Sequence, residues 1–573
     1  MKIRTIVGAA FAVCAAIVIG AIAYSNYIGS EKIDGEGIRT FENYGQIQRV
    51  LSGIKEEPPI FYATGNEPVE DLAEAGPVQP NAAAGTAKGD AHSDTYIQVE
   101  GVDEADIIKT DGKYIYYTSR VGYDVVIAKV RGGKAEEAAV ISEEDTGISA
   151  EDLFLTGDRL VVTGTEYEES GNYYAPMRTT TTAACIYDIS DPEHPDLIGK
   201  YRQSGGCISS RVTDGYLYLI TNDYLSDGQR IVPLAGADEN YDKLPADHVC
   251  CFPEPYSKSY AVIGSVKVDS AKGRLKTKTR AVLGASESIY CSGSAIYLPD
   301  YRMDYRDYEA ESPDERTWII RADIGKGKID FAEQGSVRGH VNDQFSMDEK
   351  DGCFRIATTA YVKGKDVNYL YVLDENLDVI GKVKGFAAGE QIKAVRYMGD
   401  TAYVITYEQT DPLFVIDLSD PNNPEMMGSV EITGFSSLLV PEGEDKLIGI
   451  GTATSEEELG EVEDGIKIAL FDISDPMEPK VLDSIEYKDW YSEAQYDHRA
   501  LVANEGGGWY AIPFYSWEED KGGVIRFEAS GDMLKEVETC ETEKGIDRCL
   551  FIDDYIYGLS NEEDEIISWK MAH

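Results

Sequence analysis

The chain has 573 residues and a net charge of −50, because 103 Asp and Glu side chains outnumber 53 Lys and Arg. A hydrophobic content of 43% can fill a core, which excludes disorder throughout, and the length excludes a small disulfide scaffold. An acidic surface field of this size repels phosphate groups, so we expect no nucleic-acid partner.

The first 24 residues have the pattern of a signal peptide or a membrane anchor. Lys2 and Arg4 precede an uncharged apolar run from Ile6 to Tyr24. The run ends near a small-x-small cleavage site, Ala21-Ile22-Ala23, and it is also nearly long enough to span a bilayer. Residues 1–24 are therefore a signal peptide or a transmembrane helix, and both alternatives place the folded part outside the cytoplasm. We expect a protein that is secreted, or anchored in the cell membrane by residues 6–24.

Two short regions separate this segment from the main domain. Residues 25–63 form a short helical or irregular segment, because apolar side chains between Phe41 and Ile54 recur at helical spacing. Residues 64–95 are rich in Ala, Gly, Pro, Glu and Asp, with almost no large apolar residue, and we predict a disordered linker that acts as a flexible tether.

From residue 96 to residue 573, a turn followed by an apolar strand recurs nine times. The copies align on Tyr116, Val161, Tyr218, Tyr297, Arg355, Tyr403, Ile448, Tyr510 and Tyr557. Spacings of 45 to 79 residues fit propeller blades, which repeat at roughly 40–50 residues, with insertions in the longer intervals. The predicted fold is all-β: a single large β-propeller of eight or nine four-stranded blades.

The ends of this domain suggest how the ring closes. The last copy ends near Trp569, after its third strand. We expect residues 95–99 to supply the missing strand, because an open sheet edge has to be protected. In three copies a second strand ends in Ser-Asp-Pro, and we interpret these carboxylates as turn-forming groups rather than as a binding site.

Three long stretches carry a resemblance to a known family. They are QVEGVDEADIIKTDGKYIYY (98–117), VNDQFSMDEKDGCFRIATT (341–359) and QTDPLFVIDLSDPNNP (409–424). They resemble the secreted proteins of bacteria and archaea that contain a C-terminal β-propeller domain distantly related to WD-40 repeats. The resemblance implies an extracytoplasmic propeller with WD40-like repeats. It implies no reaction or ligand, because the family is functionally uncharacterised, and the Trp-Asp dipeptide itself is absent here.

Eight cysteines follow the apolar segment, and an even number in an exported protein suggests disulfides. Cys540 and Cys549 flank a short charged loop between two strand-like runs, so we predict that they pair. The alternative, buried free thiols, suits Cys353 and Cys185. No C-x2-C pair occurs, so the cysteines predict no metal site.

Motif searches predict no catalytic residue and no cofactor. The sequence contains no G-x-S-x-G, H-E-x-x-H or P-loop pattern. Asp374, Asn376 and Asp378 match the first ligands of an EF-hand loop, but Val379 and Gly385 stand at the required Gly and Glu positions. Bound Ca²⁺ is thus possible without support from a motif, and we predict no metal ligands.

The densest polar residues beside strands are Asn342, Gln344 and Asp348, with Arg396 before a later turn. They are the candidate binding residues, although such groups also satisfy backbone between blades. His340 and His498 could face the central channel, but such histidines are more often ordinary hydrogen-bonded residues.

These patterns favour an exported, non-enzymatic binding or scaffold propeller at the cell surface. Its partner would be an envelope protein, peptide or glycan, with membrane contact only through the N-terminal segment. The alternative is an extracellular polymer-acting hydrolase or lyase with carboxylates such as Asp348 or Glu349 in the propeller channel.

Overall fold

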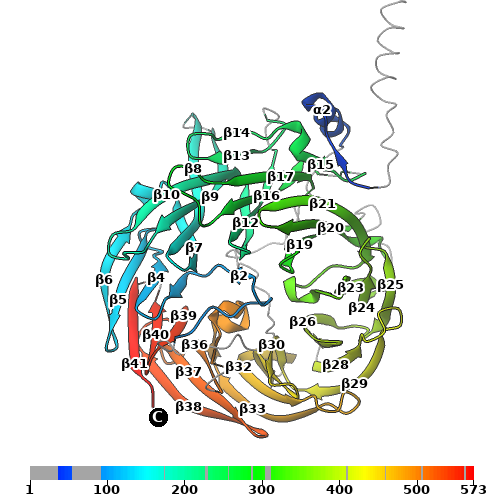
Figure 1. Ribbon diagram of the computed structural model, residues 1–573. Coiled ribbons are helices and arrows are strands. Elements are labelled where there is room, and N and C mark those ends of the chain that lie inside the picture. Colours follow the sequence, from blue (N-terminus) through cyan, green and yellow to red (C-terminus); the bar gives the residue numbers. More distant parts are fainter. Residues whose placement is uncertain are drawn as a thin grey trace, which may run out of the picture.

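Many strands of this protein are buried on both faces, because their sheets stack against one another around a ring (Figure 1). The structure is a computed structural model that describes residues 37–54, 92–172, 175–225, 230–253, 255, 257–284, 288–303, 312–407, 411–457, 460–504, 508–560 and 563–572. Within these residues the strands form nine sheets. The first strand of each sheet lies near the centre of the ring and the last at its periphery.

The four main strands of each of the first three sheets are β3 (Ile108–Thr110), β4 (Tyr114–Thr118), β5 (Val125–Arg131) and β6 (Lys134–Ile141); β7 (Ser149–Thr156), β8 (Arg159–Asn172), β9 (Ala175–Asp188) and β10 (Asp196–Ser204); and β11 (Gly206–Thr213), β12 (Tyr216–Tyr224), β16 (Ser259–Lys267) and β17 (Thr277–Leu283). Two short strands extend the second sheet and three extend the third. The next three consist of β18 (Tyr290–Cys291), β19 (Ala295–Met303), β20 (Glu315–Gly325) and β21 (Lys328–Arg338); β22 (Met347–Lys350), β23 (Cys353–Val362), β24 (Lys365–Leu373) and β25 (Val379–Phe386); and β26 (Gln391–Met398), β27 (Thr401–Tyr407), β28 (Asp411–Asp417) and β29 (Glu425–Ile432).

The last three sheets consist of β30 (Phe435–Glu442), β31 (Lys446–Glu457), β32 (Gly460–Asp472) and β33 (Lys480–Lys488); β34 (Trp490–Tyr491) and β35 (Val502–Asn504), which both pair with β36 (Trp509–Ser516), followed by β37 (Lys521–Ser530) and β38 (Met533–Thr542); and β39 (Arg548–Ile552), β40 (Tyr555–Ser560) and β41 (Glu565–Lys570). The remaining elements are β1 (Arg39–Thr40), α2 (Tyr44–Gly53), β2 (Asp103–Glu104), α3 (Glu143–Thr146), β13 (Leu234–Ala237), β14 (Asp242–Lys243), η1 (Ala246–His248), β15 (Val249–Cys251), η3 (Gln344–Ser346), η4 (Glu493–Gln495) and η5 (His498–Ala500).

The predicted all-β propeller is confirmed. Eight of the sheets have at least four strands, and the ninth has three within the described residues. All nine aligned repeat positions fall in the second strand of a sheet: β4, β8, β12, β19, β23, β27, β31, β36 and β40. The repeat was visible in the sequence because each hairpin joins a glycine or aspartate turn to a strand that is buried on both faces.

Local turn chemistry also follows the expectation. Asp214 and Gly215 have φ of 52° and 73°, the left-handed pair that a tight hairpin such as β11–β12 requires. In each Ser-Asp-Pro turn the aspartate carboxylate accepts a hydrogen bond from the backbone two residues further on, at 3.3 Å from Glu193, 3.0 Å from Asn422 and 3.0 Å from Met477. These carboxylates stabilise turns, as predicted.

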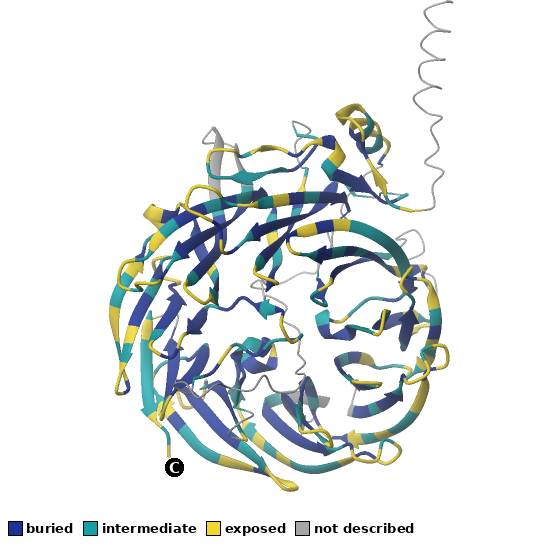
Figure 2. Ribbon diagram, viewed as in Figure 1, coloured by how far each residue is buried: buried dark blue, intermediate teal, exposed yellow. Residues whose placement is uncertain are grey.

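The core is divided into hydrophobic clusters between neighbouring sheets. Figure 2 shows buried residues along the inner strands and exposed residues at the periphery. One cluster packs Ile108 and Ile115 of the first sheet against Leu550 and Ile552 of the ninth. The first and last sheets are therefore in contact, and this packing closes the ring.

A short N-terminal segment packs on the outside of the third sheet. β1 pairs with β15, and α2 buries Ile47 and Leu51 in a cluster with Tyr260 and Val262. The helix begins where the Asn43 side chain accepts a hydrogen bond from the Gln46 backbone N–H, at 3.1 Å. The predicted short helix is thus present.

The residues that carry the prediction of export or membrane anchoring are not described by the structure. The predicted signal peptide or anchor (1–24) lies outside the described residues, as do residues 64–91 of the predicted linker. Among the helices within the described ranges, none is long and apolar enough to cross a membrane.

The predicted closing strand was misplaced. Residues 95–99 form no strand in the structure. Instead His92 bridges Ile552, and the Ser93 backbone N–H donates to the Phe551 carbonyl at 3.0 Å. Both partners belong to β39, the innermost strand of the ninth sheet, so the chain enters the ring at its centre rather than at its outer edge.

Candidate functional site

The centre of the ring is crossed by residues 92–106, here called the strap. Figure 1 shows its short strand β2 near the middle of the ring. The strap contacts sheets on several sides: Tyr96 lies in the cluster between the seventh and eighth sheets, Val102 lies between the third and fourth, β2 pairs with β11, and Asp106 bridges Leu153 of β7. The segment ties distant sheets together where they converge.

Glu104 is the most enclosed carboxylate of the strap, with 4% of its side chain exposed. Its Oε1 accepts a hydrogen bond from the Gln98 backbone N–H at 3.0 Å. Its Oε2 lies 3.1 Å from His498 Nε2 and 3.4 Å from Arg211 Nη2. Burial opposes ionisation, but Arg211 and His498 outweigh it and hold the pKa of Glu104 well below its usual range. The carboxylate is therefore a fixed negative charge.

A second group of charges lies beside the first. Asp497 accepts hydrogen bonds from Arg499 Nη2 at 2.8 Å and from Arg548 Nη2, while Arg548 Nε donates to Asp106 Oδ1 at 3.0 Å. Burial raises the pKa of Asp497, yet Arg499 and Arg548 overcome this and lower it well below its usual range. For Asp106 burial prevails over the attraction of Arg548, and the pKa is raised. Arg548 thus stabilises mainly the Asp497 charge.

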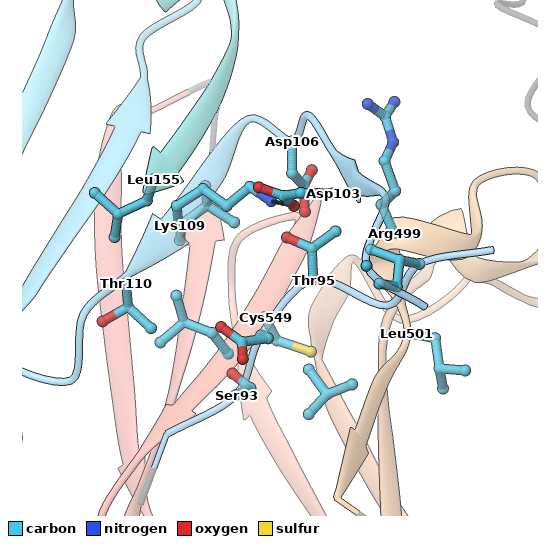
Figure 3. Close-up of a pocket in the computed structure, with 16 residues that line it drawn as sticks. Ser93, Thr95, Asp103, Asp106, Lys109, Thr110, Leu155, Arg499, Leu501 and Cys549 are labelled. Atoms are coloured by element: carbon cyan, nitrogen blue, oxygen red, sulfur yellow. Dashed lines mark hydrogen bonds and ion pairs between the residues drawn. The ribbon is translucent and has the colours of Figure 1, made fainter. Parts of the chain in front are cut away.

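A cavity of about 330 Å³ adjoins these charges, and Figure 3 shows its lining. Asp103 and Asp106 lie near the Lys109 amino group, with Ser93 and Cys549 further along the cavity. Lys109 Nζ donates to Asp103 Oδ1 at 3.1 Å and to the Glu104 carbonyl at 2.6 Å. Burial raises the pKa of Asp103, although Lys109 opposes the shift. The charged lining is therefore engaged in holding the strap.

The four predicted binding residues fall into different surroundings. Gln344 joins the strap: its Oε1 accepts from Arg211 Nη2 at 2.7 Å, and its carbonyl accepts from Gln98 Nε2 at 3.1 Å. Asn342 Nδ2 donates to Asp343 Oδ2 at 2.6 Å and, at 3.4 Å, to the Lys393 carbonyl on β26. The structure therefore places Gln344 among the hydrogen bonds that hold the strap, and Asn342 at the junction of two sheets.

The other two candidates lie within the blades. Asp348 faces Arg355 across the β22–β23 pair and accepts a hydrogen bond from its Nε at 2.8 Å. Arg396 is fully buried on β26. These placements fit the alternative interpretation, in which the polar groups satisfy partners between and within blades, and ligand binding by any of the four stays a prediction.

Sequence reasoning missed the residues that anchor the strap. It identified His498 as a channel candidate, and the structure places this ring against Glu104. It did not identify Glu104, Asp106, Arg499 or Arg548. The available signal was EGVDEAD (100–106), the acidic stretch inside the first family-like motif, which has too many carboxylates for an ordinary strand boundary.

Cys540 and Cys549 lie in one hydrophobic cluster between the eighth and ninth sheets. Both are free thiols in the structure, and burial raises the pKa of Cys540 to about 11. Their predicted pairing stays a prediction. Within the part of the chain that is described, no group of three His, Cys, Asp or Glu side chains is placed to hold a metal ion.

The predicted polar turn at Asp374 is held by the side chain of that residue. Asp374 Oδ1 accepts backbone hydrogen bonds from Asn376 at 2.9 Å and from Asp378 at 3.0 Å. The carboxylate thus closes a polar hairpin turn between β24 and β25, which is the interpretation that the sequence favoured.

Two proteins of known sequence resemble this chain over most of its length, and a family model matches most of it. An uncharacterised protein of Archaeoglobus fulgidus is 27% identical and covers 97% of each chain. An uncharacterised protein of Methanocaldococcus jannaschii is 28% identical over 84% of this chain and 82% of its own. A solved structure described as a eukaryotic initiation factor matches over 81% of this chain and 99% of its own, with 9% identity and a TM-score of 0.39. A family model described as a beta propeller domain matches residues 92–571, from the first residue of the strap to the end of the ninth sheet. The chain therefore belongs to the beta propeller domain family.

Proposed function

We propose that this protein is an exported, non-enzymatic binding or scaffold propeller at the cell surface. The observation that carries the proposal is the strap, which crosses the ring centre and pairs its carboxylates with arginine and histidine side chains from distant sheets. A ring whose centre is held in this way is a rigid platform. Its ligands would bind to the loops at the two faces of the ring.

The polymer-cleaving alternative has less support. A glycosidase uses two carboxyl groups about 5–9.5 Å apart, one of them an acid that can donate its proton to the substrate. Glu104 and Asp497 are held ionised, and Asp106 accepts from Arg548. Asp348 pairs with Arg355. These carboxylates are engaged in structural contacts.

Export is the second part of the proposal. It rests on the apolar segment 6–24, which secretes the protein or anchors it in the cell membrane. The partner is an envelope protein, peptide or glycan, and the acidic surface disfavours nucleic acid. Membrane contact is confined to the N-terminal segment.

The test is cross-linking of the tagged full-length protein in its native envelope, followed by mass spectrometry of the captured material. We expect one dominant envelope partner at near-equal amount. The control joins residues 1–91 to an unrelated soluble domain, which keeps the N-terminal segment and removes the propeller. Recovery of the tagged protein in the cytoplasm, absence of a partner above this control, or turnover of an envelope polymer by the pure protein would overturn the proposal.

A further inference from the structure

Two adjoining hollows lie at one face of the ring, across the seventh, eighth and ninth sheets. Their volumes are about 340 and 670 Å³, and Tyr491 and Trp517 line both. In a four-stranded antiparallel blade, the link from one sheet to the next and the turn between the second and third strands lie at the same end. Tyr491 lies on β34 and pairs with Tyr515 near the end of β36, and Trp517 belongs to the β36–β37 turn, so both lie on this face.

The wall shared by the hollows is aromatic. Trp517 is 76% exposed, and its ring meets the edge of Tyr515 with centroids 4.7 Å apart. Tyr496 is 44% exposed and stacks on Tyr491 at 5.6 Å. Beneath them Trp490 stacks on Phe514 at 4.2 Å. A large exposed aromatic surface on a rigid base is typical of a binding site.

The rim of the hollows is acidic. Carboxylates line the first hollow at Glu493, Glu543, Asp547 and Glu563, and the second at Asp464, Asp489 and Glu518. Lys544, which also lines the first hollow, lies 3.6 Å from Glu563 and pairs with Glu565 as well. These two carboxylates balance its charge, and Lys488 pairs with Asp464 of the second hollow at 3.4 Å. The carboxylates that remain outnumber the cations, so the hollows carry excess negative charge.

Aromatic faces and carboxylates attract the same kind of group. The face of an aromatic ring carries partial negative charge and binds Lys or Arg side chains, most strongly when the ring is that of Trp. Carboxylates add Coulombic attraction to a cation and repel phosphates and acidic sugars. Burial, together with repulsion from Asp547, raises the pKa of Glu493, so a bound cation would relieve crowding of like charges.

We propose that this aromatic–acidic cleft, formed by the two hollows, binds Lys or Arg side chains of a basic peptide segment. The proposal rests on the binding function proposed above and names the class of its partner. The cleft takes one cationic side chain in each hollow, on either side of the wall formed by Tyr491 and Trp517.

The test is isothermal titration of the purified protein at physiological salt with a short synthetic peptide in which Arg and Lys alternate with Ser. Trp517→Ala should weaken binding about two- to fivefold, because the exposed ring contributes a solvent-accessible cation–π contact. Glu543→Gln and Glu563→Gln should each weaken it severalfold. Tyr361→Ala, which removes an aromatic ring 43% exposed on β23, is the matched control and should bind like the wild type.

Three outcomes would overturn the proposal that the aromatic–acidic cleft binds basic side chains. Equal affinity of Trp517→Ala and the wild type would assign peptide binding to the overall negative charge. Spermine, or a neutral peptide with Gln and norleucine at the basic positions, binding as tightly as the probe would refute recognition of basic side chains. A neutral oligosaccharide whose binding is lost in Trp517→Ala would make the cleft a sugar site. The Trp517→Ala protein should melt like the wild type, because the ring is exposed.

The experiment in cells distinguishes an error in the cleft proposal from an error in the proposed binding function. If Trp517→Ala still captures the envelope partner in cells at the wild-type level, the cleft proposal is wrong and the binding function stands. If neither protein captures a partner above the control, the binding function is wrong.

Discussion

Replacing Glu104 by Gln tests whether the strap holds the ring together through its buried charges. The substitution keeps the shape of the side chain and removes its charge, so Arg211, whose side chain is 7% exposed, loses its carboxylate partner. Removing one partner of a buried ion pair costs about 3–5 kcal/mol. The Gln amide oxygen can still accept from the Gln98 backbone N–H, which places the expected loss at the lower end of that range.

The size of the effect can be converted into a melting temperature. The matched domain, residues 92–571, has about 480 residues, and an unfolding entropy of ~2.1 cal/mol/K per residue gives ~1 kcal/mol/K for the whole ring. A loss at the lower end of that range should therefore lower the melting temperature of the Glu104→Gln protein by about 3 °C. Calorimetry measures this shift, and limited proteolysis should show faster cleavage within residues 92–106.

The control is an ion pair of the same chemistry on the surface. Glu193 and Lys129 lie 2.6 Å apart with side chains 43% and 55% exposed, so Glu193→Gln should leave the melting temperature unchanged. A Glu104→Gln protein that melts and resists protease like the Glu193→Gln protein would show that the strap is not held by its charge.

Three further predictions concern pH, thiols and metal. Burial raises the pKa of Asp343 to about 6. The free energy of unfolding that protonated Asp343 contributes is therefore complete below pH ~4, and up to about 3 kcal/mol of it is lost as the pH rises through 6. Chemical denaturation at a series of pH values should show this loss in the wild type and not in Asp343→Asn. Glu104 and Asp497, with lowered pKa values, act in the opposite direction, and their stabilisation should be lost as the pH falls below about 4. Non-reducing peptide mapping of the exported protein should find Cys540 joined to Cys549, and both thiols reacting with alkylating agent after unfolding would contradict the pairing. EDTA should leave the melting temperature unchanged, whereas a drop that Ca²⁺ restores would reveal a bound ion.

The fold could be predicted because its determinants are local. Each repeat joins a turn such as Asp214-Gly215 to a strand buried on both faces, and both signals lie within about ten residues. The strap could not be predicted in the same way. Glu104 meets His498 across 394 residues and Asp106 meets Arg548 across 442, so no spacing in the sequence connects them.

The misplaced closing strand has a physical cause. Residues 95–99 alternate in the manner of a strand, but Tyr96 is buried between two sheets and the Gln98 amide donates to backbone carbonyls of another blade. These tertiary contacts take the place of the strand pairing that the alternating pattern of residues 95–99 favoured. Polar residues cluster around Gln344 because the chain there contacts the strap, which a single sequence cannot distinguish from a ligand site.

The strap also determines the order in which the molecule can fold. The Ser93 hydroxyl accepts a hydrogen bond from the Phe551 backbone N–H, 458 residues away, and Arg548 follows the first eight sheets in the sequence. The blades are hairpins with short-range contacts and can form one after another, whereas the contacts at the centre require a loop that spans nearly the entire domain. Until the ninth sheet is complete, Asp106 has no Arg548 beside it and the strap lacks its pairing with β39. The first segment of the propeller to be synthesised is thus among the last to reach its native contacts.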